Sequence, residues 1–123
     1  MIIMKKTVLL SAPYMIPSAQ KFKRLLAYYD VDLVLAPVEE RLEESQLLEL
    51  AGSFDGTLCG DDKYTARVIE HCIPRLKVIS KWGTGIDSID RAAAARLGVK
   101  VGNTPNAFTL PVADSVLGYM LSF

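Results

Sequence analysis

The sequence predicts an α/β fold in which a five-stranded parallel sheet carries helices on both faces. Five compact apolar segments alternate with segments whose apolar residues recur at helical spacing. This alternation favours a parallel sheet, because the connection between two parallel strands normally contains a helix. Half of the 123 residues are hydrophobic and 23% are charged, which is typical of a globular domain with its own core.

The expected strands are short apolar runs, most of which end at a proline, a glycine or a polar turn. Such runs are typical of strands that are covered on both faces of a sheet. We expect strands at residues 7–12, 31–36, 54–59, 76–80 and 99–102.

The expected helices lie between these strands, at residues 19–29, 39–51, 65–72 and 89–97. Residues that favour helix ends flank them. The expected amino-terminal caps are Ser18, Thr65 and either Asp87 or Ser88, and the expected carboxyl-terminal stops are Gly52 and Gly98.

Composition narrows the possible partners. The 14 lysines and arginines balance the 14 aspartates and glutamates, whereas nucleic-acid-binding proteins usually carry a positive excess. No apolar segment is long enough to span a membrane, and the apolar run near the amino end is too short for a signal peptide. Cys59 and Cys72 lie in core-like segments without the spacing of metal ligands. We therefore expect a cytoplasmic protein with two buried thiols and neither a nucleic-acid nor a membrane partner.

Two features could be taken for a metal site and a catalytic residue, but the residues around them do not support these interpretations. The glutamate-rich segment 39–51 contains no histidine or aspartate, so we interpret it as a solvated helix face and predict no metal site. His71, the one histidine, lies late in the helix expected at 65–72 and far along the chain from the glycine-rich loop. General acid–base catalysis needs a partner and a cleft, so we interpret His71 as structural.

The sequence Gly83-Thr84-Gly85 follows a strand and precedes a helix, at the edge where open α/β sheets bind ligands. It matches the first two glycines of the dinucleotide motif. Ser88 replaces the third glycine, however, and no acidic residue ends the next strand. Backbone N–H groups in such a loop suit a small anion such as a carboxylate. Lys81 either adds a positive charge or is a solvated strand end, and Trp82 either forms a pocket wall or covers the sheet edge.

Beyond Thr104 the pattern changes. Pro111 suits the first turn of a new helix, and the residues that follow are apolar on nearly every side. Such a helix is normally buried, yet the sequence ends at Phe123 with nothing left to cover it. We therefore expect either a chain cut from a larger protein or a helix that docks on a partner. Self-association through this helix, as a homodimer, follows from its uncovered faces.

Segments 76–90, 98–107 and 111–117 resemble the NAD-dependent D-isomer-specific 2-hydroxyacid dehydrogenases, in particular the phosphoglycerate and glycerate dehydrogenases. The resemblance implies a flavodoxin-like substrate-binding domain for residues 1–104. It also implies that residues 105–123 are the hinge and first helix of a truncated Rossmann-type NAD-binding domain. In such enzymes the Gly-x-Gly loop binds the substrate carboxylate through backbone N–H groups. The implied substrate-binding residues are Lys81, Trp82, Gly83, Thr84 and Gly85.

The same resemblance places the family's catalytic arginine, glutamate and histidine, and its NAD phosphate loop, beyond Phe123. It implies a complete enzyme that transfers a hydride between NAD(H) and a D-2-hydroxy acid/2-keto acid pair, of the 3-phosphoglycerate or D-glycerate type. The chain itself, with no catalytic residue, is expected to be inactive and to bind NAD poorly. Two aspartates, Asp61 and Asp62, are expected to face the pocket, where they would disfavour a phosphorylated substrate. The alternative is a non-enzymatic binding or interaction module with the same fold.

Overall fold

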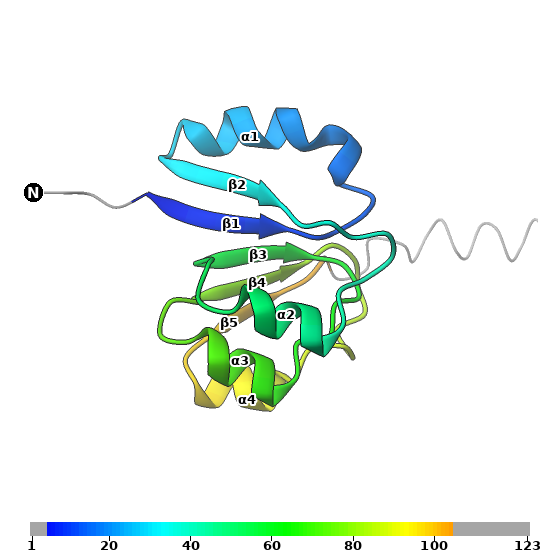
Figure 1. Cartoon of the computed structure of the whole chain (residues 1–123), viewed down its shortest axis with the longest axis vertical. Helices are drawn as coiled ribbons and strands as arrows, with labels where there is room; N and C mark the ends of the chain where they lie inside the picture. Colours follow the sequence, from blue (N-terminus) through cyan, green and yellow to red (C-terminus); the bar gives the residue numbers. More distant parts are fainter. Residues whose placement is uncertain (1–4, 105–123) are drawn as a thin grey trace, which may run out of the picture.

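The computed structural model describes residues 5–104, which form a five-stranded parallel sheet with helices on both faces (Figure 1). The order across the sheet is β2-β1-β3-β4-β5. The winding reverses between β1 and β3, and open α/β sheets bind ligands at such a point. The predicted fold class is confirmed, and each strand end lies within two residues of its expected position. The strands are β1 (Lys6–Leu10), β2 (Val31–Leu35), β3 (Gly56–Cys59), β4 (Val78–Lys81) and β5 (Lys100–Gly102).

Two apolar layers enclose the sheet. Leu9 and Leu10 are consecutive on β1, so their side chains point to opposite faces, and each is buried in a different core cluster. Leu10 packs with the helix that follows β1, whereas Leu9 belongs to the larger cluster formed with the other three helices. Figure 1 shows the first helix beside β2 and the other three gathered near β3, β4 and β5. The helices are α1 (Ala19–Ala27), α2 (Glu44–Leu50), α3 (Ala66–Cys72) and α4 (Arg91–Arg96). A 3-10 turn, η1 (Ile16–Ser18), directly precedes α1.

Helix α2 begins five residues later than the sequence pattern predicts. Glu43 has an extended backbone, and its side chain accepts a hydrogen bond from the N–H of Gln46. The Gln46 side chain accepts a 2.8 Å hydrogen bond from the Glu43 N–H in return, which completes a capping box. Glu39 and Glu40 therefore lie in the loop between β2 and α2 rather than on a solvated helix face.

One of the expected helix caps is present in the structure, and another is formed by a different residue. Thr65 caps α3 as predicted and accepts a 3.3 Å hydrogen bond from the Val68 N–H. Asp90, not Asp87 or Ser88, caps α4 by accepting a 2.9 Å hydrogen bond from the Ala93 N–H. The Ser88 hydroxyl is buried without a hydrogen-bond partner in the described part of the chain.

Three further residues near helix ends were also assigned a role from the sequence. Gly52 lies two residues after the end of α2 with φ of +84°, as predicted for a helix stop. Ser18 lies at the amino end of α1, but its side chain forms no cap hydrogen bond. Gly98 follows α4 with φ of +76°, the left-handed conformation typical of a helix stop, as predicted.

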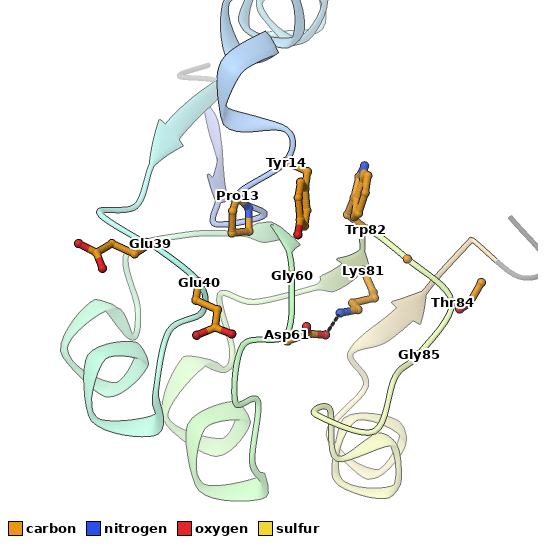
Figure 2. A pocket seen from close by; sticks show the side chains of 11 residues that line it. Pro13, Tyr14, Glu39, Glu40, Gly60, Asp61, Lys81, Trp82, Thr84 and Gly85 are labelled. Atoms are coloured by element: carbon orange, nitrogen blue, oxygen red, sulfur yellow. Dashed lines mark hydrogen bonds and ion pairs between the residues drawn. The ribbon is translucent and has the colours of Figure 1, made fainter. Parts of the chain in front are cut away.

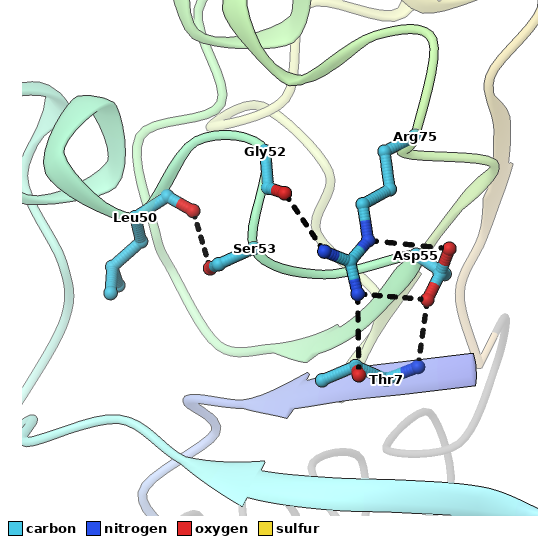
Figure 3. A network of polar contacts seen from close by, with 6 residues as sticks. All are labelled: Thr7, Leu50, Gly52, Ser53, Asp55 and Arg75. Atoms are coloured by element: carbon cyan, nitrogen blue, oxygen red, sulfur yellow. Dashed lines mark hydrogen bonds and ion pairs between the residues drawn. The ribbon is translucent and has the colours of Figure 1, made fainter. Parts of the chain in front are cut away.

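A polar network joins three segments at the amino-terminal edge of the sheet (Figure 3). Asp55, just before β3, accepts a 2.8 Å hydrogen bond from the N–H of Thr7 on β1. Arg75 forms an ion pair with Asp55 at 3.5 Å and donates a 3.0 Å hydrogen bond to the Gly52 carbonyl. The network fixes this edge of the sheet, opposite the edge that carries the glycine loop.

Some of the remaining features expected from the sequence fall within residues 5–104, and others fall outside the described residues. Cys59 and Cys72 are buried free thiols, as expected. Within residues 5–104, no helix has the length and apolar character needed to cross a membrane. In the same range, no group of three or more acidic, histidine or cysteine side chains is arranged to hold a metal ion. The expected hinge and apolar helix at 105–123 lie outside the described residues.

Candidate functional site

A pocket of about 410 Å³ lies at the carboxyl-terminal edge of the sheet (Figure 2). Four segments line it, and each contains or follows the end of a strand: residues 13–14 after β1, 39–40 after β2, 60–61 after β3, and 81–85 at the end of β4. All five residues that the sequence assigned to substrate binding, 81 to 85, are among them. The pocket therefore occupies the position at which open α/β sheets bind small molecules.

Hydrogen bonds from the end of β5 fix the orientation of the glycine loop. The Gly83 carbonyl accepts a 2.9 Å hydrogen bond from the Thr104 N–H, and the Thr84 carbonyl accepts one of 2.9 Å from the Asn103 side chain. In a trans peptide the N–H of the next residue points away from the carbonyl. The N–H groups of Thr84 and Gly85 therefore point away from β5, which leaves two adjacent donors for an anion.

The helix that follows the loop does not contribute its amino end to this anion site. Helix α4 begins at Arg91, six residues after Gly85, and Asp90 already occupies its cap. The donors are therefore those of the loop itself, contrary to the expectation of a loop placed directly at a helix start. The same geometry disagrees with a dinucleotide loop, in which the pyrophosphate rests on the first turn of the helix. Residues 5–104 thus offer no fit for the NAD pyrophosphate at this loop.

Lys81 lies at the end of β4, and its side chain is only 5% exposed. The alternative of a solvated strand end is therefore wrong. Its Nζ forms an ion pair with the carboxylate of Asp61, whose side chain is 77% exposed (Figure 2). The charge of Lys81 is thus largely balanced before any ligand binds.

Two aromatic side chains, Tyr14 and Trp82, form one wall of the pocket (Figure 2). The rings of Tyr14 and Trp82 stack with their centroids 5.1 Å apart and an interplanar angle of 26°. Both residues line the pocket and remain exposed, so Trp82 forms a pocket wall, one of the two roles left open for it. Tyr14 was not predicted, although its position just after the end of β1 places it at the same edge of the sheet.

Glu39 and Glu40 also line the pocket and were missed, because the sequence pattern extended α2 back over them. Figure 2 shows them on the side of the pocket opposite Trp82 and Thr84. Both are exposed. With Asp61, they make the pocket more acidic than the sequence indicated.

Asp62 does not face the pocket, contrary to the prediction for the turn at 60–62. It is fully buried and accepts hydrogen bonds from the Ser11 hydroxyl, the Leu42 N–H and the Gly60 N–H. Burial raises the pKa of Asp62, and these hydrogen bonds oppose that rise only in part. Asp62 is therefore part of the framework of the loops and not of their binding surface.

The part of the pocket that the structure describes contains no histidine, serine or cysteine side chain. His71 is on α3, and its Nδ1 lies 2.7 Å from the Arg67 carbonyl, away from the lining residues. Cys59 is close behind the pocket, but burial raises its pKa to about 12, so the thiol stays neutral at physiological pH. The described lining thus offers a ligand hydrogen-bond donors and acceptors, but no histidine for proton transfer and no serine or cysteine nucleophile.

Comparison with known families gives one clear result. The family described as D-isomer specific 2-hydroxyacid dehydrogenase, catalytic domain, matches residues 6–116. The chain belongs to this family. The resemblance seen in the sequence is therefore confirmed.

Two curated members and one solved structure show how much of a dehydrogenase the chain spans. It is 36% identical over 89 residues to a hydroxypyruvate reductase of Thermotoga maritima, covering 72% of this chain and 29% of the relative. It is 38% identical over 84 residues to a D-3-phosphoglycerate dehydrogenase of Methanocaldococcus jannaschii, covering 68% of this chain and 15% of the relative. The fold matches that of the NAD⁺-bound 3-phosphoglycerate dehydrogenase of Entamoeba histolytica with a TM-score of 0.78 at 21% identity, covering 95% of this chain and 38% of that one. The chain thus spans less than a third of the length of these two curated 2-hydroxyacid dehydrogenases.

Proposed function

We propose that this chain is the substrate-binding part of an oxidoreductase that interconverts a D-2-hydroxy acid and the corresponding 2-keto acid with NAD(H). Substrates of the D-glycerate or 3-phosphoglycerate type agree with the activities named for its relatives. Residues 1–104 would form the substrate domain, and residues 105–123 the hinge and first helix of the cofactor domain. A homodimer through that helix belongs to the same proposal.

The observation that carries this function is the orientation of the glycine loop. The end of β5 holds the carbonyls of Gly83 and Thr84, so two backbone N–H groups are available to a substrate carboxylate. They need no reorganisation when the anion arrives, which is the main advantage of a preformed binding site. The role of these residues is to bind the carboxylate and to fix the position of the neighbouring carbon.

The described residues cannot perform the reaction alone. Hydride transfer needs NAD(H), which supplies or accepts the hydride when it is bound, and a group that moves the hydroxyl proton. The chain covers 29% of the Thermotoga relative, so we place the proton-transfer group and the NAD site on the portion that this chain does not span. We expect residues 1–123 alone to show no turnover and to bind NAD weakly.

The test uses the complete polypeptide that contains residues 1–123. NADH oxidation with hydroxypyruvate, and NAD⁺ reduction with D-glycerate, should both proceed. The Gly85→Pro substitution removes one N–H donor. We expect the KM for the 2-keto acid to rise about tenfold to a hundredfold, because a hydrogen bond to a charged group contributes about 1.5–3 kcal/mol.

The matched control is Gly85→Ala, which keeps the N–H and places a Cβ in open space. It should raise KM much less than Gly85→Pro does, because the N–H donor is kept, and thermal unfolding should show that both variants are folded. Failure of the complete polypeptide to transfer a hydride to any 2-keto acid would reject the proposed function and favour the binding-module alternative.

A further inference from the structure

The pocket carries more negative than positive charge. Among the described residues that line it, Glu39, Glu40 and Asp61 are acidic and Lys81 is the single cation. Figure 2 shows Asp61 in contact with Lys81 near the centre of the pocket and Glu40 on the neighbouring loop. Three carboxylates therefore accompany one ammonium group.

Lys81 is poorly placed to receive a second anionic group of a ligand. Its side chain is almost completely buried, and its Nζ is held against Asp61. Asp61 is the exposed member of the pair. A phosphate that approached Lys81 from the pocket would therefore meet the Asp61 carboxylate, a charge of its own sign, at short distance.

The acidic groups also determine whether the pocket favours a hydroxyl or a phosphate on the tail of the ligand, which is the part beyond the carbon that carries the 2-hydroxy or 2-oxo group. Carboxylate oxygens only accept hydrogen bonds, whereas a hydroxyl group can donate one. A phosphate monoester carries a charge of about −1.5 to −2 at pH 7 and offers mainly acceptor oxygens. A hydroxyl tail thus complements Asp61 and Glu40 in both charge and hydrogen bonding, and a phosphorylated tail complements neither.

We propose that the site takes a short unphosphorylated 2-hydroxy or 2-oxo acid whose tail carries a hydroxyl group, and that Asp61 is the specificity-determining residue that excludes a phosphorylated tail. The proposal rests on the proposed function, because it places the ligand carboxylate on the N–H groups of Thr84 and Gly85. The tail hydroxyl then donates to Asp61 or Glu40. The Tyr14–Trp82 stack covers the carbon atoms of the ligand.

The experiment measures binding to the chain of residues 1–123, so it does not depend on turnover. The ¹⁵N-labelled chain is titrated with D-glycerate and with 3-phospho-D-glycerate, and the backbone amide signals of Thr84 and Gly85 are followed. We expect D-glycerate to bind at least about tenfold more tightly, because one like-charge contact at about 4 Å is enough for such a ratio.

Two variants test the role of charge in this ratio. Asp61→Asn removes a carboxylate and releases Lys81, so affinity for 3-phospho-D-glycerate should rise about tenfold. Glu40→Gln removes an exposed carboxylate without touching the buried lysine, and should shift the ratio in the same direction by a smaller factor. The matched control is Glu70→Gln on α3, where Glu70 pairs with Arg96 outside the pocket, and it should leave the ratio unchanged.

The outcomes separate the two proposals. Equal or tighter binding of the phosphorylated ligand at Thr84 and Gly85 overturns the selectivity and leaves the carboxylate-binding loop intact. An unchanged ratio in both Asp61→Asn and Glu40→Gln overturns the role of the acidic residues. If neither ligand shifts the two amides, the carboxylate site itself is wrong, and the specificity argument falls with it.

Discussion

The buried carboxylate of Asp62 accepts a 2.5 Å hydrogen bond from the hydroxyl of Ser11, which joins the turn after β3 to the end of β1. The same carboxylate accepts a 2.5 Å hydrogen bond from the Leu42 N–H, just beyond the loop that carries Glu39 and Glu40. One buried side chain thus fixes three of the four segments that line the pocket. The fourth, the glycine loop, is held separately by the end of β5.

Replacement of Asp62 should therefore destabilise the fold and loosen the pocket. In Asp62→Ala, the Ser11 hydroxyl and the N–H groups of Leu42 and Gly60 lose their buried acceptor. Each buried donor without a partner costs about 1–3 kcal/mol, so we expect the free energy of unfolding to fall by about 3 kcal/mol or more. Urea unfolding followed by circular dichroism measures the loss.

The isosteric variant Asp62→Asn separates the hydrogen bonds from the shape of the side chain. Its amide keeps one acceptor oxygen for Leu42, but its NH₂ group faces the Gly60 N–H, another donor. We expect an intermediate loss of stability. A loss below about 0.5 kcal/mol in Asp62→Ala, the range of ordinary surface substitutions, would contradict the role of Asp62 as the link between the loops.

Asp55 should make stability depend on pH at the opposite edge of the sheet. Burial opposes its ionisation, but the hydrogen bond from the Thr7 N–H and the contacts with Arg75 outweigh burial and lower its pKa below 3.8. The unfolded chain therefore takes up a proton first as pH falls. The stabilisation is complete above about pH 3.8 and disappears as pH falls through the native pKa.

The variant Asp55→Ala should lose about 1–3 kcal/mol of unfolding free energy at neutral pH, because the Thr7 N–H and Arg75 lose their acceptor. The difference from wild type should shrink as the pH is lowered below 3.8 in a series of urea titrations. The control is Asp32→Ala, whose surface pair with Lys5 is about half exposed and contributes at most about 1 kcal/mol. A difference that stays constant down to low pH would contradict the assignment.

The sheet and the glycine loop were predictable because each depends on a local signal. Apolar runs bounded by Pro37 or Gly60 mark strands wherever they occur, and Gly83 and Gly85 in succession mark a loop of exposed N–H groups. The start of α2 was less clear, because Leu42 continues the helical spacing of Leu47 and Leu50. The capping box at residues 43 and 46 has a glutamate where Ser, Thr, Asp or Asn is typical of an N-cap, so the sequence did not mark the helix start or leave Glu39 and Glu40 outside the helix.

The roles of Asp61 and Asp62 could not be separated from the sequence. They are adjacent and chemically identical, yet one is 77% exposed on the pocket and the other is fully buried. The difference arises from contacts with Ser11 and Leu42, which are 51 and 20 residues away from Asp62 along the chain. Long-range contacts of this kind leave no periodic pattern. The number of charged groups that face the pocket could therefore be determined only from the structure.

The cap of α4 can be tested by comparing the stability of variants at Asp90, which caps the helix in the structure, and at Asp87, which the sequence suggested as a cap. Asp90 accepts a hydrogen bond from the Ala93 N–H, and Asp90→Ala should lower the free energy of unfolding by about 1 kcal/mol. Asp87→Ala, three residues earlier and exposed, should change it by less than about 0.5 kcal/mol. Chemical denaturation of the two variants in parallel measures the difference. Equal losses, or a larger loss for Asp87→Ala, would show that the helix begins earlier.

The two glycines of the loop should respond differently to the same substitution. Gly83 has φ of +132°, a conformation that residues with a side chain rarely adopt, whereas a Cβ on Gly85 would lie in open space and its φ is outside that region. We expect Gly83→Ala to lose about 1–3 kcal/mol of unfolding free energy, because the backbone is strained or must shift. Gly85→Ala should stay within about 0.5 kcal/mol of wild type.

The shift of the backbone in Gly83→Ala also has a consequence for binding. The peptide between Gly83 and Thr84 carries both the carbonyl anchored by Thr104 and the N–H of Thr84. If this peptide turns to relieve the strain, the N–H group no longer points toward the proposed position of the ligand carboxylate, and D-glycerate should bind more weakly in the ¹⁵N titration. A Gly83→Ala chain that keeps wild-type stability and wild-type D-glycerate affinity would show that the positive φ of Gly83 is not what shapes the proposed carboxylate site.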